Sequence, residues 1–245
     1  GTEEFLEILK KKEKIIEIAS KLAAYAELWI SENTADTKRN AHYARISEIC
    51  TDAGNEVMFF TLWFKDLNEG IANKFIESSG KYHYFLDRIR AFKKYTLKEK
   101  EEQIINLKDL TGNQAATRFY DILTNKFKFE YKGKKLSQEE MNQYKESLDR
   151  KERVSAYELV LGRYGREEDV LGEIYKTIAS DWKNENIKLR GFSSPITARN
   201  HGNDVPDLAV DALLKVVRKN SKLFQEYFKI KAKLCKLKKM DRYDL

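Results

Sequence analysis

Three histidines are the residues in this sequence best suited to bind a metal, and they are widely spaced. None of His42, His83 and His201 has a second histidine four positions away. A catalytic zinc site takes three protein ligands, usually histidine together with Glu, Asp or Cys. The His-Glu-x-x-His pattern, which places two of these ligands on one helix face, is absent. We therefore predict that these 245 residues contain no metal ligand and no catalytic residue, and the sequence identifies no substrate-binding residue.

Each histidine also has an ordinary structural interpretation. His201 lies in the polar segment 199–204, where it is either a ligand contact or, as we favour, a surface loop residue. His83 lies between two tyrosines, and we expect it, like His42, to be on a helix surface or packed.

The other residues that could do chemistry lack their usual partners. Cys50 and Cys235 are far apart, with no Cys-x-x-Cys spacing, which argues against a disulfide framework and fits a reducing compartment. No Gly-x-Ser-x-Gly elbow is present. Gly162 and Gly165 are not followed by a Walker lysine, so we expect a turn between helices there.

The charge pattern favours solvated helix faces. The chain has 46 basic and 39 acidic residues, a net charge of +7, and the two signs are interspersed. RNA binding would need one-sided basic clustering. The nearest candidate is a run of lysines that we interpret as a solvated face: Lys229, Lys231, Lys233, Lys236, Lys238 and Lys239.

The elements that would position any site are mainly helices. Only 11 glycines and 2 prolines interrupt the chain, and no apolar run is long enough to span a membrane. Apolar spacing predicts helices over about 5–30, 38–50, 57–64 and 82–95, with Gly54 interrupting after the second. Further helices are expected over about 154–164 and 169–184, with a loop at 191–195.

Two capping boxes and one hairpin are predicted between these helices. Thr96 with Glu99 should open a helix over 97–107, and Ser137 with Glu140 should open one that runs toward Leu148. Residues 126–132 alternate between apolar and charged side chains, and Gly133 supplies a turn, so we expect one small β-hairpin in a protein more than about 60% helical.

A last helix should begin near Pro206, with the proline at its first position. Its apolar residues are more numerous than one packed face needs. We predict that part of this set stays exposed and docks another part of a larger protein: Leu213, Val217, Phe224 and Phe228, widened by Val216, Tyr227, Ile230 and Leu234.

Several stretches, in order, resemble the oligoendopeptidase F family of zinc metallopeptidases, which are thimet-oligopeptidase-like. The similarity is clearest in the Arg-Asn segment at 199–200, the Asn-x-x-Pro helix start at 203–206, the Tyr-Phe-x-x-Lys helix at 227–231 and the Tyr-Asp pair at 243–244. No single motif is diagnostic, but the ordered set is.

The resemblance implies an amino-terminal, non-catalytic portion of a zinc-dependent oligoendopeptidase. It implies a cytoplasmic parent enzyme that cleaves short unfolded peptides, with a missing carboxyl-terminal catalytic half that carries the zinc, and a segment that is inactive alone. The expected fold is mainly α: a multi-helix bundle with long helices and one small β-hairpin, part of a clamshell-like helical peptidase. This portion would form one wall of the substrate channel.

We expect three segments: a long-helix lobe over 1–110, a hairpin-containing helical domain over 111–190 and, over 191–245, the start of the catalytic domain. Two other functions remain open. One is a stand-alone helical module that binds peptides or proteins, and the other, less favoured, is a basic RNA-binding helical protein. A membrane partner is not expected.

Overall fold

The computed structural model describes residues 1–244 and is mainly helical, with about 80% of the chain in helices. The helical fold class with one hairpin is confirmed. The chain divides into two compact units, and each is described by itself. The first unit comprises residues 1–122 and 177–191, and the second comprises residues 123–176 and 192–245. Two helices, α7 (Asn113–Asn125) and α10 (Glu168–Trp182), continue from one unit into the other.

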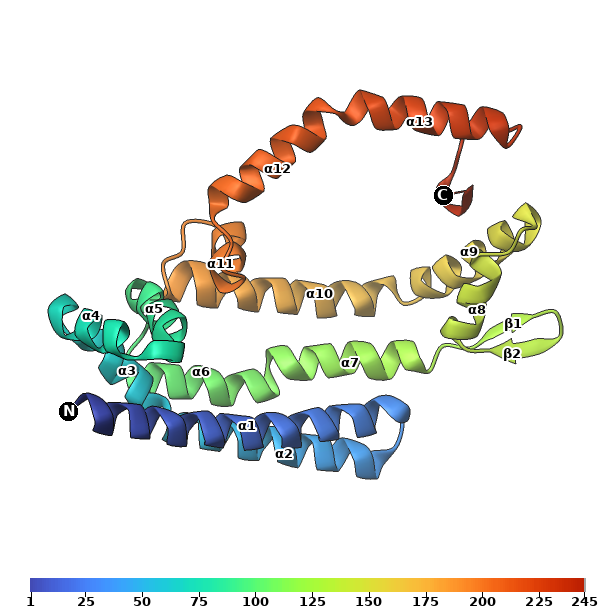
Figure 1. Cartoon of the computed structure of the whole chain (residues 1–245). Coiled ribbons are helices and arrows are strands. Elements are labelled where there is room, and N and C mark those ends of the chain that lie inside the picture. Colours follow the sequence, from blue (N-terminus) through green and yellow to red (C-terminus); the bar gives the residue numbers. More distant parts are fainter. Residues whose placement is uncertain (245) are drawn as a thin grey trace. The chain divides into compact units, whose positions relative to one another are not determined.

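The first unit begins with two long helices that lie side by side, α1 (Thr2–Glu32) and α2 (Thr37–Glu56) (Figure 1). Asp36 caps α2 by accepting hydrogen bonds from the Lys38 and Arg39 amides. Arg39 reaches back to donate to the carbonyl of Trp29 at 2.9 Å, which ties the two helices at their turn. The predicted interruption at Gly54 is wrong: α2 continues to Glu56, because a single glycine costs a helix only about 1 kcal/mol.

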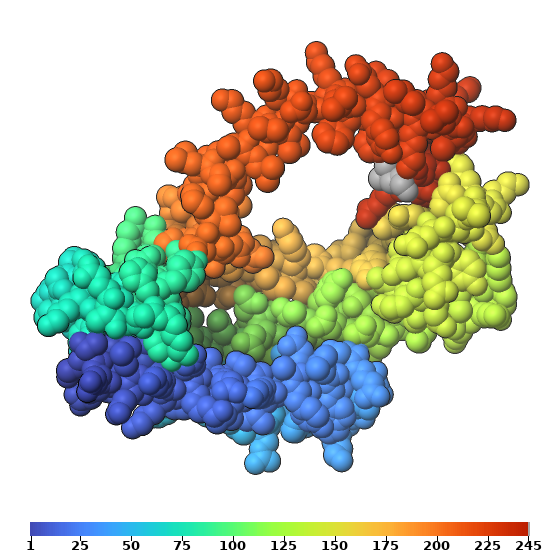
Figure 2. Space-filling view, viewed as in Figure 1, coloured from blue at the N-terminus to red at the C-terminus, as the bar shows by residue number. Residues whose placement is uncertain are grey.

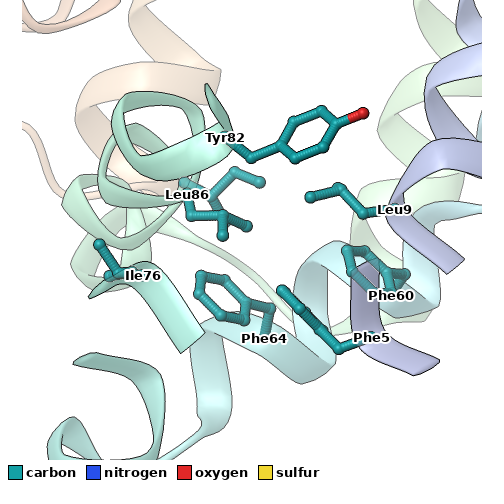
Figure 3. Close-up of a cluster of buried hydrophobic side chains, with 8 residues drawn as sticks. Phe5, Leu9, Phe60, Phe64, Ile76, Tyr82 and Leu86 are labelled. Carbon is teal, nitrogen blue, oxygen red and sulfur yellow. The ribbon is translucent and has the colours of Figure 1, made fainter. Parts of the chain in front are cut away.

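Short helices follow and enclose the core of the first unit. They are α3 (Met58–Asp66), α4 (Glu69–Ser78), η1 (Gly80–Tyr82), α5 (His83–Ala91) and η2 (Lys93–Tyr95). The helix predicted over 82–95 is thus α5 flanked by two 3₁₀ turns. Figure 3 shows the buried cluster that joins them to the start of α1: Phe5, Leu9, Phe60, Phe64, Ile76, Tyr82, Leu86 and Ile89.

The helix α6 (Glu99–Thr111) begins later than predicted. The Thr96 hydroxyl does not cap it, because that hydroxyl donates to the carbonyl of Phe92 at 2.8 Å. Glu101, two residues beyond the predicted Glu99, reaches back to the Lys98 amide at 2.9 Å. The capping box predicted at Thr96 and Glu99 is therefore wrong, although a helix does start in this segment.

Beyond α10, the chain continues as the π-helix η3 (Lys183–Leu189), and Arg190 is the C-cap of η3. Arg190 makes two hydrogen bonds to Glu102 of α6, at 2.8 and 2.9 Å, and one to Glu185 at 2.7 Å. These charge-assisted bonds fix the end of the helical stretch against α6 within the first unit.

The second unit contains the predicted hairpin. Strands β1 (Phe129–Tyr131) and β2 (Lys134–Leu136) are antiparallel, and Phe129 is paired with Leu136. Lys132 and Gly133 form the turn, and both have positive φ, at 50° and 72°. This is the conformation that two-residue hairpin loops favour, because its twist matches that of the strands.

Two helices cover the hairpin, α8 (Gln138–Lys145) and α9 (Arg150–Gly165). The capping box at Ser137 is confirmed, because Ser137 Oγ accepts from the Glu140 amide and Glu140 accepts from the Ser137 amide. The helix it opens ends at Lys145, short of Leu148. A second core forms here from Phe127, Phe129, Leu136, Met141, Ala156 and Val160.

The last part of the second unit contains α11 (Pro195–Gly202), α12 (Asp207–Lys219), α13 (Ser221–Leu234) and η4 (Arg242–Asp244). Three sequence predictions are wrong here. Residues 199–202 are helical, because the Ser194 hydroxyl accepts from the Thr197 amide and starts α11. Pro206 is the N-cap of α12 and not its first residue. The single last helix is divided at Asn220.

Candidate docking surface

The three histidines do not form a ligand group. His42 lies with its ring centroid 5.0 Å from that of Trp29, in the α1–α2 pair, and His83 is exposed on α5. His201 is not in a loop as predicted: it lies in α11, partly buried, with its ring centroid 5.8 Å from that of Phe192. Both cysteines are free thiols, Cys50 half-buried and Cys235 exposed.

Within residues 1–244, one group of three potential metal ligands lies close together, and it contains no histidine. Asp109, Asp181 and Glu185 place one carboxylate oxygen each within 4.8 Å of the others. Burial first, and then the charges of Glu185 and Asp181, raise the pKa of Asp109 from 3.8 to about 6, while Arg190 acts to lower it. Three carboxylates do not match the histidine-containing set of a catalytic zinc site. The residues described do not fit a catalytic zinc ion.

Sequence reasoning missed this acidic group and its neighbour Arg190. Glu102 and Arg190 are 88 positions apart, and nothing in the spacing of either indicates the other. Burial raises the pKa of Glu102, but the Arg190 guanidinium, the Leu97 amide and Lys65 together bring its pKa below the usual value. The Arg190–Glu102 pair therefore consists of two ionised groups, and its role is structural: it holds the end of η3 against α6.

The feature that the sequence did predict is an exposed apolar surface on the last helices. Every residue from Asp211 to Ile230 is exposed. Figure 2 shows side chains of α12 and α13 (orange to red) at the surface of the second unit. We call the α12–α13 strip the following eight residues, exposed by between 39% and 79%: Leu213, Val216, Val217, Phe224, Tyr227, Phe228, Ile230 and Leu234. The predicted exposure is confirmed.

The helices that present the strip are held at both ends within the second unit. At the beginning of α12, Asp207 accepts from Thr197 and from the buried side chain of Asn200, at 3.0 and 2.8 Å. Beyond α13, Asp244 accepts from Arg150 of α9 at 2.8 and 3.0 Å. The strip is therefore exposed on an anchored segment and is not a frayed terminus.

A groove of about 830 Å³ lies at the end of α13 and extends the strip. Its apolar lining includes Phe228, Leu237 and Met240. One acidic residue lines the groove, Asp241, and its carboxylate lies 3.8 Å from the Arg150 guanidinium. The other charged lining residues are basic: Lys229, Lys233, Lys238, Lys239 and Arg242. Such a groove is complementary to an apolar segment that carries negative charge.

These features define a class of protein: a helical segment that leaves a wide apolar surface uncovered. Monomeric proteins rarely leave so large an apolar patch uncovered unless it is an interaction surface. No helix within residues 1–244 is long and apolar enough to cross a membrane.

Comparison with known proteins identifies which proteins this segment is similar to. A family model described as Oligopeptidase F matches residues 63–129. The oligoendopeptidase F homolog of Lactococcus lactis is 22% identical over 264 residues, covering 100% of this chain and 42% of the relative. Oligopeptidase PepF of Bacillus subtilis is 21% identical, covering 98% of this chain and 37% of the relative.

A solved structure agrees with these relatives. The oligoendopeptidase-F structure from Enterococcus faecium matches with a TM-score of 0.84 at 22% identity, over 100% of this chain and 48% of that one. The resemblance of the chain to the amino-terminal portion of the oligoendopeptidase F family is therefore confirmed. The chain spans less than half the length of the curated relatives it matches.

Proposed function

We propose that this chain is the amino-terminal region of a zinc-dependent oligoendopeptidase that cleaves short unfolded peptides. In this proposal the zinc and the catalytic residues belong to a carboxyl-terminal half, and the chain supplies one wall of the substrate channel. The match over the whole chain but less than half of each relative supports the division of labour. The proposed setting is the cytoplasm, and the proposed segments remain 1–110, 111–190 and 191–245.

The observation that carries the proposal is the uncovered α12–α13 strip. Tyr227, Ile230 and Leu234 are 56%, 60% and 79% exposed, so they have no covering partner within the described chain. Burying side chains of this size stabilises an interface by about 1.5–3 kcal/mol each. We assign the strip to contact with the carboxyl-terminal half, and the basic groove beside it favours an acidic, apolar segment of that half.

Extending the chain tests this function. The natural reading frame is expressed past Leu245 and assayed with an internally quenched peptide of about ten residues, a length suited to an enclosed channel. We expect the longer protein to hydrolyse the peptide and to spare the same sequence within a folded protein, while residues 1–245 alone are inactive. A longer protein that folds, retains zinc and leaves the peptide uncut would contradict the proposal.

Two substitutions on α13 examine the docking step within that assay. Ile230→Asp places a charge in the proposed contact, which buried apolar interfaces tolerate poorly, so activity should fall about tenfold or more. Lys222→Asp changes an exposed charge on the same helix and is the matched control. Equal activity of the two variants would contradict the proposal that the α12–α13 strip contacts the carboxyl-terminal half.

A stand-alone module that binds peptides or proteins is the second candidate, and the same exposed strip favours it. The two candidates differ in one result. A peptidase requires that the residues after Leu245 restore hydrolysis, whereas a binding module retains its partner with residues 1–245 alone. RNA binding by the basic groove would instead weaken steeply as salt is raised.

A further inference from the structure

A large cavity lies within the first unit, whereas the α12–α13 strip belongs to the second. Its volume is about 1100 Å³, and it is lined by residues of α1, α3 and α4 and by the segment that leads into α6. Ligand pockets are commonly about 300–1000 Å³, so a drug-sized or short peptide ligand fits. Nothing in the proposed function uses this cavity.

Four of the five aromatic residues that line the cavity form a connected wall. The centroid of Phe5 lies 4.3 Å from that of Phe75 and 6.3 Å from that of Trp63, and the centroids of Phe60 and Trp63 are 5.8 Å apart. Phe5 and Phe60 also belong to the buried core, and Figure 3 shows them close together between α1 and α3. Trp63 is 45% exposed. The wall is therefore rigid and presents one accessible indole.

Lys65 lines the same cavity, and its ammonium makes a single hydrogen bond to the described residues. Its ammonium donates to Thr96 Oγ1 at 2.7 Å, and that hydroxyl in turn donates to the Phe92 carbonyl. Among residues 1–244, no carboxylate lies within ion-pair distance of Lys65. An ammonium has three N–H donors, so two of them have no protein acceptor.

Other charged groups near Lys65 affect its pKa. Burial lowers the pKa of Lys65, and Arg190 lowers it further, whereas Glu102 raises it. Glu102 is engaged by Arg190 in two hydrogen bonds. The other charged groups that line the cavity are Lys93 and Lys98, Asp66 and Glu99, and the Gly1 ammonium, which is paired with Glu4. An incoming anion therefore meets a lining with four positive groups against three negative ones, and a Lys65 ammonium with N–H groups left to donate, beside an aromatic wall.

We propose that this cavity binds the carboxyl terminus of a short peptide that ends in an aromatic residue. The terminal ring packs on the exposed indole of Trp63, and the terminal carboxylate accepts hydrogen bonds from the remaining N–H groups of Lys65. Aromatic pairs and charge-assisted hydrogen bonds supply affinity and orientation together. The inference does not depend on peptidase activity, because the cavity lies wholly within residues 1–99.

Binding of matched ligands to the 245-residue chain tests the carboxylate. Isothermal titration compares N-acetyl-leucyl-phenylalanine with its carboxamide. We expect the acid to bind at least about tenfold more tightly, as loss of one charge-assisted hydrogen bond implies. Equal affinities, or no binding of the acid at millimolar concentration, would overturn the proposal. Decanoate binding more tightly than the peptide acid would assign the cavity to lipids and would also overturn it.

Two lysine variants locate the ammonium. Lys65→Met keeps an apolar stem and should make acid and amide bind equally. Lys12→Met is the neighbouring control: Lys12 is also half-buried, burial and then the charge of Lys65 lower its pKa, and its ammonium lies 5.4 Å from the Phe60 ring centroid, yet it does not line the cavity. Lys12→Met should retain the preference for the acid. An equal loss in both variants would show a general folding effect and contradict the assignment.

Trp63→Leu provides a second test that leaves Lys65 in place. Removing the half-exposed indole should weaken acid and amide alike, by about tenfold, while the preference for the acid remains. A normal circular dichroism spectrum confirms that the variant is folded. Unchanged binding to a folded Trp63→Leu protein would place the ligand elsewhere and overturn the proposal.

Discussion

The Arg150 guanidinium on α9 holds the Asp244 carboxylate through two hydrogen bonds, Nε to Oδ1 at 2.8 Å and Nη2 to Oδ2 at 3.0 Å. Arg153 adds a donor to the Tyr243 carbonyl at 2.7 Å. The Asp244 side chain is 2% exposed. This pair fixes the segment after α13 against α9.

Breaking this pair should free the segment between α13 and Asp244. Asp244→Asn removes the charge that Arg150 and Arg153 share, and charge-assisted bonds are about twice as strong as neutral ones. Trypsin should then cut after Lys236, Lys238 or Lys239 several-fold faster, measured by mass spectrometry. Asp241→Asn is the control, because its contact with Arg150 is longer, at 3.8 Å. Equal cleavage rates in both variants would contradict the anchoring role.

Acid should weaken the same anchor. The hydrogen bond from Arg150 is the main reason that the pKa of Asp244 lies below its usual 3.8. A depressed folded pKa gives stability that is present above the unfolded pKa and lost as pH falls through the folded value. Cleavage by an acid-active protease should therefore accelerate only below about pH 4 in this segment, and the Asp244→Asn protein should not show the change.

Asp109 should behave in the opposite sense. Its pKa is raised, mainly by burial, from 3.8 to about 6, so the folded state binds its proton more tightly than the unfolded state does. Stability contributed by this group is therefore full below about pH 4 and falls as pH rises to about 6. Asp109→Asn removes the titration. The melting temperature of the variant should rise relative to that of the parent protein between pH 4 and 7, and a constant difference would contradict the assignment.

Removing the Phe64 ring should destabilise the first unit. Phe64 is fully buried in the cluster of Figure 3, so Phe64→Ala leaves a cavity and should cost about 3–5 kcal/mol in the free energy of unfolding. Phe119→Ala is the comparison, because Phe119 is 62% exposed on α7, and it should cost about 0.5 kcal/mol or less. Urea unfolding followed by circular dichroism measures both. Similar losses would show that the core is not where we place it.

Replacing two glycines by alanine should have opposite effects on stability, because one has a positive φ and the other lies within a helix. Gly133 has a φ of 72° in the hairpin turn, so Gly133→Ala should destabilise by about 1 kcal/mol. Gly172 lies in α10 with open space at its Cβ, so Gly172→Ala should stabilise by about 0.5–1 kcal/mol. Opposite signs in urea unfolding are the expected result, and a shared sign would contradict one of the two local conformations.

The hairpin and the amphipathic helices were predictable because local patterns determine them. Alternation at residues 127–131 and the Ser137 capping box both depend on neighbours within a few positions. The α12–α13 strip was predictable for a related reason, since an apolar surplus is visible in the composition of one helix. Division of that helix at Asn220 was missed, although Asn220 and Ser221 are residue types that favour helix caps over helix interiors.

Long-range polar contacts gave no sequence signal. Arg190 with Glu102, and Arg150 with Asp244, join residues 88 and 94 positions apart through side chains that are common on any helix surface. Thr96 illustrates the same limit locally. Its spacing to Glu99 fits a capping box. In the structure, however, the Thr96 hydroxyl donates to the Phe92 carbonyl and accepts from the Lys65 ammonium. The cavity around Lys65 likewise depends on how four helical segments meet.

Hydrogen exchange at the α12–α13 strip tests the central proposal most directly. Amide exchange is measured by mass spectrometry in residues 1–245 alone and in the protein extended through its natural reading frame. If the carboxyl-terminal half docks on the strip, peptides covering 211–234 should exchange at least about tenfold more slowly in the longer protein, because burial suppresses local opening. Peptides from α1 around Ile16 serve as an internal reference. Identical exchange of 211–234 in both proteins would contradict the proposal that this surface joins the two halves of a peptidase.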